Sequence, residues 1–207
     1  MVELVVPGLQ KFRLQLTNPL LLASGSPRRK ELLAKIGVFP TLIKNPNVDE
    51  RIRKNESAKC YTLRMAKLKI STFRDCLQYS DYIMLSADTV VVLSGQVLGK
   101  PSDINEAKNF LCKMSGRRHR IYSSLCFVTP SRNIILRTVV SIVKIKCLSS
   151  KEIDFYLSTG EWQGKAGGYA LQGFADAFVQ WFRGSYSAAV GLPLCQVYKV
   201  IDNYLLR

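Results

Sequence analysis

The sequence predicts an α/β fold, in which helices pack around a central sheet. Two observations indicate this fold class. Short apolar runs of strand length alternate with stretches whose apolar residues recur at helical spacing, and the composition is globular, with 47% hydrophobic and 22% charged residues. No linker rich in Pro, Ser or Gly divides the 207 residues into two halves. We therefore expect one continuous body that contains a cleft.

The first elements follow from apolar spacing and from capping residues. Residues 19–24 are predicted to form a short buried strand. A helix then begins at Ser26-Pro27, because serine caps helix N-termini and proline fits the first helical position. A second helix is expected over residues 57–73. On it, Lys69 falls at the edge of the apolar stripe. A lysine there either turns its charged end toward water, which the spacing alone favours, or points into a lined cleft.

The middle of the chain is predicted to hold a strand, a helix and a long hairpin. Residues 82–87 form the strand. Asp88-Thr89 follows it, and a second apolar run covers residues 90–93. Asp103 caps the next helix, with Glu106 as its capping-box partner. Residues 121–129 and 133–147 have the composition of two paired strands around a proline-containing turn.

The C-terminal third is predicted to close the fold. Ser149 begins a short helix that ends near Gly160. A glycine-rich stretch follows, and residues 177–182 form a further strand. Pro193 opens a last amphipathic helix, whose inward residues are expected to run on to Leu205.

The cysteines and apolar segments indicate a cytoplasmic protein. The six cysteines include no C-x-x-C pair and no histidine at metal-ligand spacing, so we expect buried free thiols in a reducing compartment. Charged residues interrupt the N-terminal stretch before any signal-peptide pattern develops. No apolar run reaches the ~18–20 residues of a spanning helix, so no membrane partner is expected.

The excess of basic residues predicts an anionic partner. The 30 Lys and Arg outnumber the 15 Asp and Glu and give a net charge of +15, which favours nucleic acid, a membrane surface or a phosphorylated small molecule. Because these residues are spread along the chain, most of them are expected to form an ordinary solvated surface. A nucleic-acid partner is not expected, since it would need clustered cations and exposed aromatic residues.

The segment Ser24-Gly25-Ser26-Pro27-Arg28-Arg29 is the first candidate binding site. It lies between a predicted strand and a helix N-terminus, where free backbone N–H groups, the helix dipole and two guanidinium groups together favour an anion such as phosphate. An ordinary serine cap followed by exposed arginines explains the same residues equally well.

Two acidic segments are candidates for metal or water chemistry. Asp88-Thr89 follows an apolar strand, where a carboxylate often faces a ligand crevice. Asp49-Glu50 offers hard oxygen ligands for Mg²⁺. A turn aspartate and a solvated acidic pair are the simpler explanations of these two segments.

The glycine-rich stretch and the single histidine complete the candidates. Residues 164–173 let the backbone approach a ligand closely, and the amide of Gln172 is able to pair with a base edge. A flexible loop is the alternative. His119 has no nucleophile in an elbow motif and is expected to be a structural, hydrogen-bonded residue.

Taken together, these segments resemble the Maf family of nucleoside-triphosphate pyrophosphatases. The resemblance runs from about residue 20 to residue 205, and we therefore divide the chain into an N-terminal extension over residues 1–18 and a single domain over residues 19–207. The motifs that carry it are Ser24-Gly25-Ser26-Pro27-Arg28-Arg29, Ala87-Asp88-Thr89, Gly99-Lys100-Pro101, Ser115-Gly116-x-x-His119, Lys165-Ala166-Gly167-x-Tyr169-x-x-Gln172-Gly173 and Gly191-Leu192-Pro193.

The resemblance implies a fold, an activity and a set of site residues. The fold is a central twisted mixed sheet flanked by helices, with two lobes around a deep cleft, and the protein is expected to be a homodimer. The activity is hydrolysis of a nucleoside triphosphate between the α and β phosphates, with Mg²⁺ or Mn²⁺ as cofactor. The implied catalytic residues are Asp88, Glu50, Lys69 and Lys100, of which Asp88 and Glu50 also hold the metal. The implied substrate-binding residues are Ser24, Ser26, Arg28, Arg29, Thr89, Lys165 and Gln172.

The glycine-rich motif refines the expected substrate. Its Gln172-Gly173 ending is similar to the branch of the family that favours dTTP and UTP, although modified or noncanonical nucleotides are also candidates. Gly164 stands where the family often has aspartate, and Ser123 stands where a threonine is expected. The alternative functions are a basic nucleic-acid-binding protein and a regulator that binds nucleotide without hydrolysing it.

Overall fold

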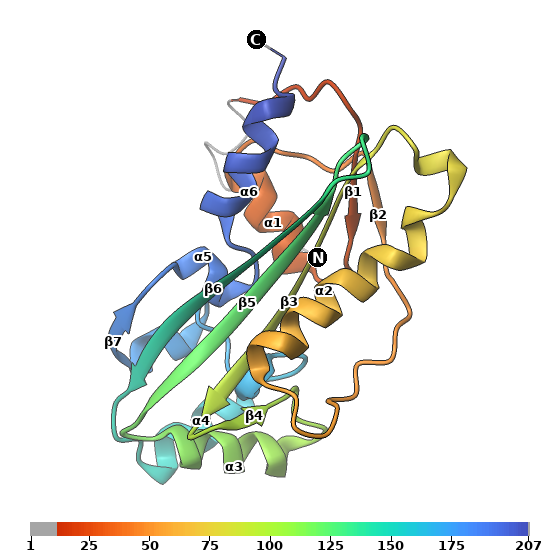
Figure 1. Ribbon diagram of the computed structural model, residues 1–207. Coiled ribbons are helices and arrows are strands. Elements are labelled where there is room, and N and C mark those ends of the chain that lie inside the picture. Colours follow the sequence, from red (N-terminus) through yellow and green to blue (C-terminus); the bar gives the residue numbers. More distant parts are fainter. Residues whose placement is uncertain (1–11, 207) are drawn as a thin grey trace.

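One mixed sheet with helices on both faces forms the body of the molecule (Figure 1). The computed structural model describes residues 12–206, so residues 1–11 of the expected extension lie outside the described residues. Within residues 12–206, no helix has both the length and the apolar character required to cross a membrane. The fold class predicted from the sequence is confirmed.

The sheet has a parallel part and an antiparallel part. Its order is β2-β1-β3-β5-β6-β7, and β4 pairs with β3 outside this path. Strand β1 runs parallel to β2 and to β3, whereas all the other pairs are antiparallel. The strands are β1 (Leu20–Ala23), β2 (Leu42–Lys44), β3 (Ile83–Leu93), β4 (Gln96–Leu98), β5 (Arg118–Val128), β6 (Ile134–Ile145) and β7 (Val179–Arg183).

The helices divide unequally between the two faces of the sheet. Helix α2 packs alone on one face, and residues of α1, α3, α4 and α6 share the core on the other face. The α-helices are α1 (Pro27–Lys35), α2 (Ala58–Arg74), α3 (Ile104–Met114), α4 (Ser150–Ser158), α5 (Tyr186–Val190) and α6 (Leu194–Ile201). Short 3₁₀ helices are η1 (Leu77–Tyr79), η2 (Ala166–Gly168), η3 (Phe174–Phe178) and η4 (Asp202–Tyr204).

Strand β1 shows how the sequence builds both cores at once. All its residues are fully buried. Leu20 and Leu22 belong to the larger core, whereas Leu21 and Ala23 pack with α2 on the opposite face. This alternation is the period of two that an extended strand imposes, and it explains why the strand reads as a continuous apolar run.

Two lobes lie at opposite ends of the sheet (Figure 1). Strands β1 and β2 with α1 and α6 form one lobe, and β4 with α3, α4 and η2 forms the other. Backbone hydrogen bonds join the chain ends of the first lobe: the N–H of Thr17 donates to the carbonyl of Tyr204, and the N–H of Leu206 donates to the carbonyl of Gln15. Residues 12–18 are thus tied to the fold.

The predicted strand boundary at Asp88 is wrong. Strand β3 runs without a break from Ile83 to Leu93, and Asp88 pairs with Ser124 of β5 in its middle. A single aspartate does not end the strand, because the residues before and after it stay paired with β5. The β5–β6 hairpin is confirmed, although β5 already begins at Arg118.

Several local predictions need smaller corrections. Asp103 caps α3 as expected, but Glu106 accepts from the backbone of Ser102 and not of Asp103. Helix α6 ends at Ile201, so Leu205 lies beyond it. Of the free cysteines, Cys126 is buried, whereas those exposed are Cys60, Cys112, Cys147 and Cys195. Strands β2 and β4, of three residues each, and helix α5, of five, were not predicted.

Candidate active site

The cleft opens where one edge of β3 has no partner strand. Strand β1 pairs with residues 83–85 of β3, and β4 pairs with residues 91–93 of the same strand. Residues 86–90 between them are paired only on their other edge, to β5. Asp88 lies at the centre of this open stretch. The gap is the floor of a cleft of about 920 Å³ between the two lobes.

All of the predicted site residues line this single cleft. They come from the β1–α1 loop, the first turn of α1, the segment before α2, α2 itself, β3, the loop after β4 and the glycine-rich loop. The residues are Ser24, Ser26, Arg28, Arg29, Glu50, Lys69, Asp88, Thr89, Lys100, Lys165 and Gln172.

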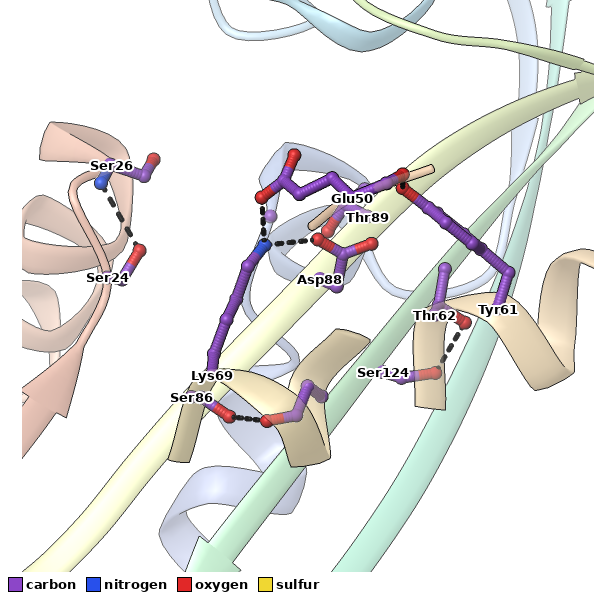
Figure 2. A network of polar contacts seen from close by, with 12 residues as sticks. Ser24, Ser26, Glu50, Tyr61, Thr62, Lys69, Ser86, Asp88, Thr89 and Ser124 are labelled. Atoms are coloured by element: carbon purple, nitrogen blue, oxygen red, sulfur yellow. Dashed lines mark hydrogen bonds and ion pairs between the residues drawn. The ribbon is translucent and has the colours of Figure 1, made fainter. Parts of the chain in front are cut away.

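A buried lysine joins the two acidic residues of the cleft. The Nζ atom of Lys69 lies 2.6 Å from Oδ1 of Asp88 and 2.8 Å from Oε1 of Glu50. Figure 2 shows the lysine side chain rising from α2 between the two carboxylates. The residue is only 7% exposed. The expectation that Lys69 turns toward water is therefore wrong, because the two carboxylates balance its charge inside the cleft.

Glu50 is held in place from both ends. Its backbone carbonyl accepts a hydrogen bond of 2.8 Å from the hydroxyl of Tyr61 on α2. The second oxygen of its side chain lies 3.8 Å from Nζ of Lys100. The neighbouring Asp49 is exposed and ion-paired with Arg51. Of the predicted acidic pair, Glu50 alone faces the cleft.

The other wall of the cleft begins at the N-terminus of α1. Ser24 is buried, and its hydroxyl accepts hydrogen bonds from the backbone N–H of Ser26 and from Nη1 of Arg29. The Nε atom of Arg29 donates to the carbonyl of Gly191. The side chain of Ser26 makes no capping bond. The positive end of the α1 dipole and the guanidinium groups of Arg28 and Arg29 therefore favour an anion at this wall.

The glycine-rich loop forms the edge of the cleft opposite Arg28. The Nη2 atom of Arg28 donates to the carbonyl of Gly164 at 3.4 Å. The N–H of Gly167 donates to the carbonyl of Gly99 at 2.8 Å, which fastens η2 to the loop after β4. Gly167 has a φ of +71°, and a Cβ atom at this position would lie 3.0 Å from Cγ2 of Val91. Only glycine fits both requirements.

Burial and charge shift the protonation of the two carboxylates in opposite directions. Burial raises the pKa of Asp88, and the positive charges of Lys69 and Arg29 only partly oppose this shift. Burial also acts to raise the pKa of Glu50, but the hydrogen bond and charge of Lys69, with the charge of Lys100, outweigh it and hold the pKa below its usual value. The two acids are thus electrostatically different.

Burial lowers the pKa of several basic groups in the cleft, and repulsion between neighbouring cations adds to it. Burial is the main cause for Arg28 and Arg29, and the two guanidinium groups also repel each other. The pKa of Lys165 is lowered by burial and by the charge of Arg28. Such mutual repulsion is relieved when a polyanion enters between the cations.

This cleft has the motifs and the surroundings expected of one protein family. The model of the family described as Maf-like protein matches residues 19–204. The chain belongs to the Maf-like protein family.

Named relatives of this Maf-like chain cover most of its length. A nucleoside triphosphate pyrophosphatase of Anaplasma marginale (strain St. Maries) is 43% identical over 89% of this chain and 93% of the relative. A dTTP/UTP pyrophosphatase of Ruegeria sp. (strain TM1040) is 46% identical over 88% of this chain and 93% of the relative. The crystal structure of a nucleoside-triphosphatase (dITP/XTP pyrophosphatase) of Mycobacterium abscessus has a TM-score of 0.46 at 15% identity, covering 89% of this chain and 97% of that one.

The histidine of the Maf-like motif is structural, as predicted. His119 is 2% exposed, and its Nε2 atom lies 2.6 Å from the hydroxyl of Tyr169, which lines the cleft. Its Nδ1 atom has no hydrogen-bond partner among the described residues. Burial lowers the pKa of His119 to about 4. The residue therefore stays neutral at pH 7 and fixes the loop that follows η2.

Sequence reasoning missed the residues that hold the site residues in place. Tyr61 is one of them. It lies eight residues before Lys69 on α2, at a spacing that puts both on one helix face, and this spacing could have indicated that Tyr61 also faces the cleft. Asn45 and Gln163 also line the cleft, but nothing in the sequence distinguishes them from other loop amides. Ser123, at a position where the family often has threonine, keeps the equivalent hydroxyl, which lies 2.9 Å from that of Thr89.

The donor set suits a hard divalent cation that is bound together with phosphate. No group of three or more potential metal-binding side chains occurs within residues 12–206. Mg²⁺ commonly takes one or two protein carboxylates and completes its shell with substrate phosphates and water. Asp88 and Glu50, which face the same lysine, match that arrangement.

Proposed function

We propose that this Maf-like chain is a nucleoside triphosphate pyrophosphatase, which hydrolyses a nucleoside triphosphate to the monophosphate and pyrophosphate. The observation that carries the proposal is the convergence of five cationic side chains on a cleft whose floor holds the buried Asp88–Lys69 pair. The names of the relatives, nucleoside triphosphate pyrophosphatase and dTTP/UTP pyrophosphatase, support the same reaction.

The cationic groups bind the triphosphate. The N-terminus of α1 offers the positive end of its helix dipole, and Arg28 and Arg29 offer planar forks that match phosphate oxygens. Lys100 and Lys165 extend this positive surface across the cleft. A triphosphate brings about four negative charges, which must be balanced before a nucleophile approaches the phosphorus.

Asp88 acts on the water that attacks the α phosphorus. The carboxylate accepts a proton from the water as the new P–O bond forms, and the bond between the α phosphorus and the bridging oxygen breaks to release pyrophosphate. Lys69 fixes one carboxylate oxygen through its 2.6 Å contact, so the other is oriented toward the cleft. The products together contain all atoms of the triphosphate and the water.

Asp88 and Glu50 are the residues that would hold the divalent cation, Mg²⁺ or Mn²⁺. When bound, this ion neutralises phosphate charge and lowers the pKa of a coordinated water. The carboxylates also keep Lys69 between them.

Base preference is assigned to three residues on different walls of the cleft. Arg28, Thr89 and Gln172 line it, and the exposed amide of Gln172 offers both a donor and an acceptor to a base edge. The relatives named dTTP/UTP pyrophosphatase support a preference for dTTP and UTP. The proposal also includes a homodimer in the cytoplasm without a membrane partner, and the six free cysteines are in keeping with a reducing compartment.

The test is release of pyrophosphate from a panel of triphosphates with Mg²⁺ or Mn²⁺. We expect turnover of dTTP and UTP, and an Asp88→Asn variant with kcat lowered by about 100-fold to 10,000-fold, the usual effect of losing a general base. Asp81→Asn, a change at an exposed aspartate, is the matched control and should leave kcat unchanged. A folded Asp88→Asn variant with full activity, or binding of triphosphate without hydrolysis, would overturn the proposal.

A further inference from the structure

A second concentration of positive charge lies on the sheet, outside the cleft. Strands β5, β6 and β7 are neighbours, and their register sets side chains in rows across the three strands. One row is Arg118, Lys144 and Trp181, and the next is Arg120, Ile142 and Arg183. Residues opposite each other in register point to the same side of a sheet. We call the five residues Arg118, Arg120, Lys144, Trp181 and Arg183 the basic sheet face.

This face is the part of the α2 side of the sheet that α2 leaves uncovered. The hydroxyl of Ser124 on β5 contacts Thr62 of α2 at 2.7 Å, which identifies the side. Every second residue before Ser124 shares that side, so Arg120 and Arg118 follow beyond the start of α2 and are exposed. Figure 1 shows this end of β5, β6 and β7 extending clear of the helix.

The cations of the basic sheet face have no acidic partner among residues 12–206. The chain has no Asp or Glu between Glu106 and Glu152, a stretch that contains ten Lys and Arg. Within the described part of the chain, none of the cations of this face forms an ion pair. An unpaired cluster of this kind attracts a polyanion.

An exposed aromatic side chain stands among these cations. Trp181 is 39% exposed, and the guanidinium of Arg118 lies 4.9 Å from the centre of one of its rings. Val140, in the following row, is also exposed, at 41%. Sheet surfaces that combine cations with aromatic rings bind single strands, because the phosphates contact the cations while the bases stack on the rings.

We propose that the basic sheet face binds single-stranded nucleic acid. The site is separate from the cleft, since none of its residues lines the cleft. The row of Arg120 is four residues along β3 and β5 from the row of Asp88, a separation of about 13 Å. The sequence did not predict this partner, because cations that are scattered along the chain become neighbours only when the hairpin and β7 pair.

The position of Trp181 favours nucleic acid over an anionic lipid surface. A membrane surface attracts cations without needing an aromatic ring in their midst, and an apolar anchor for the bilayer would have to stand clear of the cations. Trp181 instead pairs in register with Lys144, and the guanidinium of Arg118 lies over one of its rings, so the ring does not stand clear of the cations.

The test is fluorescence anisotropy of a labelled oligouridylate of about 16 nucleotides, at several salt concentrations. We expect saturable binding that weakens as salt rises. The variant Arg120→Glu/Lys144→Glu should bind at least tenfold more weakly at about 0.15 M salt and show a shallower salt dependence. Trp181→Ala should weaken binding about tenfold, since it removes a stacking surface.

A matched control separates this face from the overall charge. The double variant Arg137→Glu/Lys199→Glu changes the net charge by the same amount, but both residues lie outside the basic sheet face. Arg137 pairs with Leu125, whose side chain is on the other side of the sheet, and Lys199 is on α6. This control should bind as the wild type does. An excess of triphosphate should not displace the oligonucleotide, and pyrophosphate release should be unchanged in all these variants.

Four outcomes would overturn the proposal. The first is equal weakening by the two double variants, and the second is displacement of the oligonucleotide by triphosphate. The third is binding of phosphatidylserine vesicles with no binding of the oligonucleotide. The fourth is a change of oligomeric state in Arg120→Glu/Lys144→Glu with oligonucleotide binding intact, which would make the face a contact between two copies of the chain.

Discussion

The candidate site depends most on the placement of one lysine. Lys69 lies at hydrogen-bonding distance from Asp88 and Glu50, so a single cation orients both carboxylates. A buried, unpaired carboxylate is costly, and removing the partner of a buried pair leaves that cost uncompensated. The positive charge of Lys69 opposes the effect of burial on the pKa of Asp88. Lys69 therefore controls the pH range in which Asp88 accepts a proton.

Lys69→Met tests this role through the pH dependence of kcat. Asp88 must be ionised to act as a base, so activity is lost as pH falls through its pKa. Removing the lysine charge raises that pKa further, and we expect the acidic limb of the profile to move to higher pH. Lys67→Met, two residues away and exposed on the same helix, is the control and should leave the limb in place. A lower kcat with an unmoved limb would contradict this role.

Residue types were predictable from the sequence, whereas their orientation was not. The motifs around Arg28, Asp88 and Lys165 indicated a phosphate site, and these residues line one cleft. The helical spacing alone favoured an outward Lys69, because spacing gives the helix face but not what lies opposite that face. Asp88, whose charge keeps the lysine inward, is 19 residues away in the chain.

At the scale of elements, the site exists because two short strands stop early. Strand β1 leaves the edge of β3 after Leu85, and β4 joins it only at Val91. The sequence predicted β3 as two pieces with Asp88 at a boundary. Its pairing with β5 is uninterrupted, because pairing depends on distant residues that local apolar patterns do not contain.

The close packing of η2 against β3 gives a prediction for Gly167→Ala. The new Cβ atom meets Val91 at 3.0 Å in a left-handed backbone conformation. We expect a loss of about 2–4 kcal/mol in the free energy of unfolding, together with a raised KM, since Lys165 and Gln172 flank this glycine. Urea denaturation and steady-state kinetics measure the two effects.

Gly160→Ala is the matched control for the packing contact. Gly160 has the same φ of +71°, but an added Cβ atom there meets nothing within 4 Å. It should cost about 1–2 kcal/mol, which is the backbone strain alone, with an unchanged KM. Equal losses in the two variants would show that contact with Val91 is unimportant.

At the scale of the whole molecule, the cleft depends on how the lobe containing η2 is attached to the sheet. One attachment is the contact between His119 on β5 and Tyr169 after η2. Sequence reasoning predicted a hydrogen-bonded histidine but not its partner, which is 50 residues away. The histidine is buried and neutral, so its protonation opposes folding.

The free energy of unfolding should therefore fall in mild acid, because His119 takes up a proton more readily in the unfolded chain than in the folded protein. An unfolded chain takes up a proton at this residue below a pH of about 6.5, whereas burial lowers the pKa of His119 in the folded protein to about 4. The unfolded state binds more protons between these values, so stability falls as pH falls through this window, by roughly 3 kcal/mol at its lower end. Urea denaturation at pH 7 and at about pH 4.5 measures the loss.

His119→Gln separates this contribution from the carboxylates that titrate in the same range. Glutamine keeps a hydrogen-bonding group near Tyr169 but takes up no proton, so the variant is expected to lose less stability than the wild type between the two pH values, whatever its stability at pH 7. The difference between the two losses is the contribution of His119. Equal losses would mean that His119 is as readily protonated in the folded protein as in the unfolded chain, and that another group governs the attachment of this lobe in acid.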